Sequence, residues 1–67
     1  MEPNELVKKA MAETRVTLGQ LGEAYGITKQ RMSVILQEEL PEEKQRDYYE
    51  TILGIARDRI RHVEEMA

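Results

Sequence analysis

The chain carries at residues 17–37 the stretch TLGQLGEAYGITKQRMSVILQ, which predicts two short helices joined by a tight glycine turn. Thr17 and Gln20 fit a capping box, in which each side chain bonds the backbone N–H of the other residue. Val16 and Leu21 stand at the positions of a hydrophobic staple, which sets the direction in which the chain enters the helix. The start of the first of these helices is therefore marked by two independent signals.

A second helix is expected just after the first one ends at Gly26, because glycine readily adopts the left-handed conformation found at helix ends. Thr28 is its expected N-cap, and Ile27 and Met32 form a second staple. Gly22 is small enough for the second helix to cross the first one closely. Four side chains are expected to hold the pair together: Leu21, Tyr25, Met32 and Ile35.

The second helix is amphipathic. Its apolar face carries Met32, Ile35 and Leu36, whereas its polar face carries Lys29, Gln30, Ser33 and Gln37. We therefore expect one side of this helix to lie in the core and the other to present hydrogen-bonding groups to solvent.

Two further helices flank this pair. The first is expected from about Asn4 to Thr14, with Asn4 as its N-cap and an apolar stripe of Leu6, Val7, Ala10 and Met11. The last is expected from Pro41 to about Glu65, a length of about 37 Å at 1.5 Å per residue. Gly54 lies inside this last helix and indicates a bend or a close helix contact.

These elements predict one all-α domain over residues 1–67. We expect a small bundle of four helices, with a helix-turn-helix at residues 17–37 and a long C-terminal helix at residues 41–65. A chain of 67 residues buries only about 60% of the surface that its unfolded form exposes. Association with a second chain is therefore a plausible additional source of stability.

Residues 21–33, LGEAYGITKQRMS, resemble the helix-turn-helix of the Cro and phage-repressor superfamily, and residues 11–17 resemble that family's first helix and its entry into the second. Residues 17–22 and 25–32 are also similar to region four of the housekeeping sigma factors, which reads the −35 promoter element. Two positions depart from the repressor pattern toward the sigma pattern, Leu18 and Gly22, where repressors usually have Gln and Ala. The acidic last helix departs from the sigma pattern. The resemblance implies DNA binding and leaves the two families as alternatives.

The resemblance places the second helix of the motif in the major groove of DNA. The residues it implies at the bases are Thr28, Lys29, Gln30, Ser33 and Gln37. Gln30 can pair with adenine through two hydrogen bonds, and Lys29 can donate to guanine or to a phosphate. The DNA backbone contacts it implies are Arg15, Thr17, Gln20 and Arg31, which set register without reading sequence. The expected function is sequence-preferring binding of double-stranded DNA by a small bacterial or phage transcriptional regulator, such as a repressor.

The charge of the chain is distributed unevenly around its net value of −3. Residues 1–37 carry five Lys and Arg against four Asp and Glu, whereas residues 38–67 carry five against nine. If the chain meets DNA, its N-terminal half should face the phosphates. The acidic second half favours the alternative function, an adaptor that uses the helix-turn-helix fold to bind a partner protein such as RNA polymerase.

The composition argues against an enzyme and against a metal site. There is no cysteine, and the one histidine, His62, cannot build a zinc site. The carboxylates of residues 38–43 have no nucleophile or phosphate-binding loop beside them, so we interpret them as solvated. We expect no cofactor and no small-molecule substrate. The longest apolar run, residues 34–36, is too short to span a membrane and the N-terminus lacks a signal-peptide pattern, so a cytoplasmic protein is expected.

Two stripes run along the last expected helix. One repeats in alternating steps of four and three residues through Tyr49, Leu53, Ala56, Ile60, Val63 and Ala67, and the other comprises Tyr48, Ile52, Ile55 and Arg59. Together the two stripes form an apolar face that is wider than is needed to cover three short helices. This width favours a homodimer contact through the C-terminal helix. The alternative is that both stripes are covered within one chain.

Overall fold

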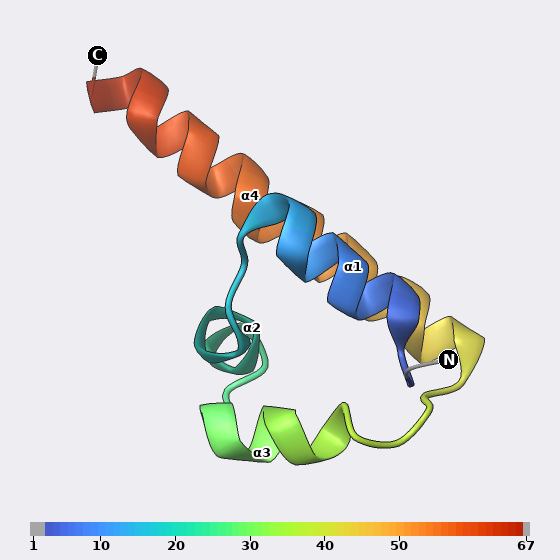
Figure 1. Cartoon of the computed structure of the whole chain (residues 1–67). Helices are drawn as coiled ribbons and strands as arrows, with labels where there is room; N and C mark the ends of the chain where they lie inside the picture. Colours follow the sequence, from blue (N-terminus) through green and yellow to red (C-terminus); the bar gives the residue numbers. More distant parts are fainter. Residues whose placement is uncertain (1–2, 67) are drawn as a thin grey trace.

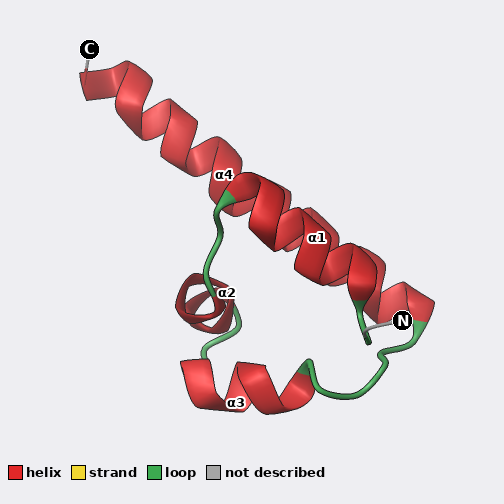
Figure 2. Ribbon diagram, viewed as in Figure 1, coloured by secondary structure: helices red, strands yellow, loops and turns green. Residues whose placement is uncertain are grey.

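The computed structural model describes residues 3–66, with the side chains of residues 3–63, as four helices joined by loops and turns (Figures 1 and 2). The helices are α1 (Glu5–Thr14), α2 (Leu18–Ala24), α3 (Lys29–Ile35) and α4 (Glu42–Met66). Residues 3–66 contain no strand. The predicted all-α fold with a long C-terminal helix is confirmed, and the helix ends lie within about two residues of those expected.

The helices form two pairs. α1 and α4 lie alongside each other and run in the same direction, and α2 and α3 pack together on one side of them (Figure 1). α2 also contacts α4, whereas α4 continues well beyond the end of α1. This extension makes the molecule elongated, with principal extents of 41 × 21 × 18 Å.

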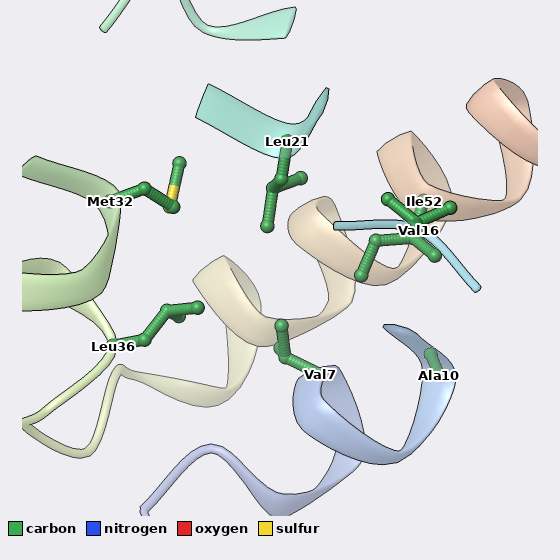
Figure 3. Close-up of a cluster of buried hydrophobic side chains, with 7 residues drawn as sticks. All are labelled: Val7, Ala10, Val16, Leu21, Met32, Leu36 and Ile52. Carbon is green, nitrogen blue, oxygen red and sulfur yellow. The ribbon is translucent and has the colours of Figure 1, made fainter. Parts of the chain in front are cut away.

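One hydrophobic core joins the two helix pairs. Its buried side chains come from all four helices and from the loop between α1 and α2: Val7, Ala10, Val16, Leu21, Met32, Leu36 and Ile52 (Figure 3). Leu21, Met32 and Ile52 have no exposed surface. Complete burial of a side chain of this size stabilises the fold by about 1.5–3 kcal/mol. The apolar members of both predicted staples are thus in or against the core.

The start of α1 corrects the expectation for Asn4. Asn4 occupies the N-cap position, but its backbone is left-handed with a φ of 58° and its side chain makes no capping hydrogen bond. The side chain is instead fully buried: Nδ2 donates to the carbonyls of Leu36 (3.0 Å) and Glu38 (2.8 Å), and Oδ1 accepts from the N–H of Leu40 (2.7 Å). Asn4 therefore ties the loop between α3 and α4 to the start of α1.

The end of α1 is completed by a residue of α4. Arg15 ends the helix with a left-handed φ of 60°, and its own backbone N–H forms a hydrogen bond at this end. The Arg59 guanidinium donates to the carbonyl oxygens of Thr14 (2.9 Å) and Arg15 (3.3 Å). These bonds satisfy carbonyls that no helical N–H can reach. Arg59 thereby connects α4 to the point where the chain turns toward α2.

Tyr25 and Ile35, expected to join α2 and α3, are not among the side chains that form the hydrophobic core or pack against it. The Tyr25 hydroxyl shares a hydrogen bond of 2.9 Å with the Thr51 hydroxyl, and its ring lies 4.8 Å from that of Tyr48, centroid to centroid. Both partners belong to α4, so Tyr25 connects α2 to α4. Ile35 is only half-buried.

α4 is a continuous helix of 25 residues, and the close contact expected at Gly54 is absent. A Cβ added at Gly54 would meet no other atom within 4 Å among residues 3–66. Within the same residues, no helix is both long enough and apolar enough to cross a membrane. Ala67, the last residue of the expected apolar stripe, lies outside the described residues.

Candidate nucleic-acid interface

The turn between α2 and α3 is built around Gly26, which has a left-handed φ of 70°. The N–H of Ile27 donates to the carbonyl of Gly22 (2.9 Å), and the N–H of Gly26 donates to that of Glu23 (3.1 Å). This pair of bonds is the Schellman motif, which ends a helix and reverses the path of the chain. The predicted glycine turn is therefore present.

Gly22 allows the two helices to approach each other. A Cβ at this position would lie 2.9 Å from the carbonyl oxygen of Ile27 and 3.1 Å from that of Thr28. Both atoms belong to the backbone that leads into α3. The close approach expected at Gly22 is confirmed, although its partner is the turn before the second helix and not the helix itself.

Both helices begin at the predicted caps. The Thr17 hydroxyl accepts from the N–H of Gln20 (3.1 Å), and Gln20 Oε1 accepts from the N–H of Thr17 (2.9 Å). The Thr28 hydroxyl accepts from the N–H of Arg31 (3.1 Å). These caps set the axis of each helix with local bonds, and they leave the Thr hydroxyl hydrogens and Gln20 Nε2 as donors toward solvent.

The polar side of α3 is open to solvent, apart from one residue. Lys29, Gln30, Arg31 and Gln37 are exposed, whereas Ser33 is half-buried. Ser33 lines a shallow groove of about 330 Å³ with residues of α1, α2 and the end of α3: Lys8, Met11, Leu18, Leu36 and Gln37. Ser33 therefore lies at the edge of the polar face, because it is next to the core residue Leu36 on the helix.

Sequence reasoning missed two residues of this surface. Val34 is 54% exposed and lies one helical turn after Gln30, so it occupies the middle of the outward side of α3. The four-residue spacing from Gln30 indicates that Val34 faces outward. Its place in an apolar run concealed this indication. Lys8 brings a further cation to the groove beside Ser33. Only the folded arrangement, which brings α1 to the edge of this groove, reveals this position.

Comparison of the chain with protein-family models, curated proteins and solved structures finds no match.

The chemistry of this surface is that of binding by polar and cationic side chains. Within the described residues, no group of three His, Cys, Asp or Glu is arranged to hold a metal ion. The exposed cations of this part of the chain are Lys29 and Arg31 on α3 and Arg15 before α2, and Lys8 lines the groove. Exposed cations next to amide groups on a rigid helix suit a ligand that offers phosphates and hydrogen-bonding edges.

Proposed function

We propose that this chain binds duplex DNA with a sequence preference and acts as a small transcriptional regulator of the bacterial or phage type. The observation that carries the proposal is the capped α2–turn–α3 unit, which buries Met32 and Leu36 and leaves Gln30 and its neighbours exposed. Figure 1 shows α2 nearly end-on while α3 lies across the view, the steep arrangement that helix-turn-helix proteins use. In such proteins the second helix enters the major groove of DNA.

The exposed side of α3 supplies groups for base recognition. Gln30 can accept from and donate to one adenine, and Lys29 can donate to guanine O6 and N7 or to a phosphate. Val34 can contact the methyl group of a thymine. Gln37 lies in the turn after α3, where it is exposed at the edge of the groove that Ser33 lines. Together they would read a short run of base pairs.

The start of each helix supplies the contacts that would set register. Arg15 precedes α2, and Arg31 lies in the first turn of α3. The free donors of Thr17, Gln20 and Thr28 are neutral and suit phosphate oxygens. Ser33 and Lys8 face the groove behind α3, so we assign them to the DNA backbone that borders the major groove.

DNA selection from a random duplex library, followed by anisotropy titrations of the selected duplex, tests the proposal. We expect Gln30→Ala to weaken binding by about five- to hundredfold and to relax the preference at one base pair. Lys29→Ala should also weaken binding, and added salt should lower the affinity steeply. Lys44→Ala is the matched control, because Lys44 is exposed on α4 and away from α3. Its affinity should equal that of the unmodified chain.

The adaptor function remains the second candidate, and the net charge of −3 favours it. An exposed Val34 at the centre of α3 also suits contact with a protein surface. If the folded chain binds no duplex up to several hundred micromolar protein at low salt, DNA binding is refuted. Capture of a polymerase subunit that Val34→Asp abolishes would then support the adaptor.

A further inference from the structure

α4 has a second apolar side that the rest of the chain leaves open. Ile52 lies in the core, and Tyr48, Ile55 and, from the other stripe, Tyr49 pack against it. The other stripe becomes more exposed along its length: Ile60 is 59% exposed and Val63 is 61% exposed. Arg59 bonds the C-terminal end of α1, and Ile60 and Val63 follow Arg59 along α4. Ile60 and Val63 therefore lie on the part of α4 that extends past α1 (Figure 1).

The same side of α4 is hollowed nearer to its start. α1 and α4 enclose a groove of about 650 Å³, whose apolar lining is Leu6, Tyr49 and Leu53. Leu6 is 49% exposed although it lies next to the core residue Val7. Charged residues of α4 border the groove: Glu42, Arg46, Glu50 and Arg57. One side of α4 thus carries an apolar groove in its first half and apolar projections in its second half.

We propose that a second copy of this chain docks along α4 in the antiparallel direction, with Ile60 of each copy in the groove of the other. The stripe from Tyr49 to Val63 has the alternating spacing of four and three residues with which two helices interlock. Antiparallel pairing sets Ile60 of the second copy opposite Tyr49, and Leu53 opposite Ala56. Two-fold symmetry repeats these contacts, so the groove of each copy receives Ile60 of the other copy.

The charges of α4 select the antiparallel direction. Residues 42–53 carry four acidic and two basic side chains, whereas residues 54–63 carry one acidic and three basic side chains. In the proposed register Glu50 lies at the edge of the seam, diagonally across from Arg57 of the second copy, and Arg57 lies diagonally across from its Glu50. A parallel pair would set the two acidic first halves of α4 side by side and the two basic second halves side by side, which is repulsive.

An interface of ordinary size would cover a small part of the surface of this chain. A stable interface buries about 800 Å² on each partner, which is about 15% of the 5203 Å² that this chain exposes. The groove and the projecting residues follow one side of a helix that is about 37 Å long at 1.5 Å per residue. This side is separate from α3, so the proposal does not depend on DNA binding.

Sedimentation equilibrium over a range of protein concentrations tests the dimer directly. We expect a dimer for the unmodified chain, and we expect Ile60→Asp to raise its dissociation constant by about thirtyfold or more while helical circular dichroism persists. A mass of one chain up to several hundred micromolar would overturn the proposal. So would a dimer that Ile60→Asp leaves unchanged, because another surface would then form it.

A charge swap tests the register. Glu50→Arg and Arg57→Glu should each weaken the dimer, and the chain that carries both changes should dimerise again. Lys44→Glu is the matched control for Arg57→Glu, because Lys44 is exposed and lies on the opposite side of α4 from the stripe. Its dimer should be as strong as that of the unmodified chain. Failure of the double variant to dimerise would overturn the antiparallel pairing.

Discussion

Replacement of Asn4 by Ala should remove a large part of the stability of this protein. The side chain is completely buried and holds three backbone groups of the loop between α3 and α4. The bond to the Leu36 carbonyl is buried, so its loss leaves an acceptor without water, at a cost of about 1–3 kcal/mol. The bonds to Glu38 and Leu40 are partly exposed, and water can replace them at a smaller cost.

The backbone adds a second cost. Asn4 has a φ of 58°, which asparagine tolerates better than alanine does, and the left-handed conformation costs alanine about 1–2 kcal/mol. The total for Asn4→Ala is then about 3–4 kcal/mol. A domain of this size has a free energy of unfolding of about 3–10 kcal/mol, so the variant should lose a third of it or more.

Asn4→Gly separates the two costs. Glycine adopts a positive φ without strain, but it has no amide to bond the loop. We expect Asn4→Gly to be more stable than Asn4→Ala by about 1 kcal/mol and still less stable than the unmodified chain by about 2 kcal/mol.

Urea unfolding followed by circular dichroism measures all three chains, at one fixed protein concentration because association also stabilises a fold. A loss of less than about 1 kcal/mol in Asn4→Ala would contradict this role of the buried amide. It would mean that the loop holds its position without Asn4.

Two further predictions concern α2. Gly22→Ala would bring a Cβ within 2.9 Å of the Ile27 carbonyl, so it should destabilise the fold by about 1–3 kcal/mol, whereas Gly19→Ala, with 3.7 Å to the nearest atom, should stabilise it by up to about 1 kcal/mol in the same urea assay. A stabilised Gly22→Ala would contradict the close approach. Burial raises the pKa of the Tyr25 hydroxyl from its ordinary value of 10.0. The unfolded chain therefore loses this proton first, so stability should fall as the pH rises through about 10, and Tyr25→Phe should flatten that fall. An unchanged slope in Tyr25→Phe would contradict the shift.

The local signals around the turn could be predicted because each joins residues close in the chain. The Thr17 and Thr28 caps each bond an N–H three residues ahead, and the Gly26 turn is closed by bonds that span three to five residues. The pattern of apolar residues then sufficed to predict that the side chains of Met32 and Leu36 lie in the core. The same pattern did not predict that Ser33 is half-buried, because partial burial at the edge of a helix face depends on which neighbouring element lies beside it.

The candidate site could be predicted in part. Lys29, Gln30, Arg31 and Gln37 are exposed, as helical spacing alone implies. Lys8 could not be found in this way, because it comes from α1 and meets the groove only through packing. Val34 was hidden in an apolar run of three residues, although its exposure follows from the same helical period.

The positions at which the helices begin and end around the turn follow from the amino-acid sequence alone, because caps and staples act over a few residues and have a recognisable spacing. The tertiary structure alone decided which distant groups meet. Asn4 bonds residues 32 to 36 positions away, and Arg59 bonds carbonyls 44 and 45 positions away. No periodicity encodes such pairs, since they depend on how α1 and α4 lie against each other.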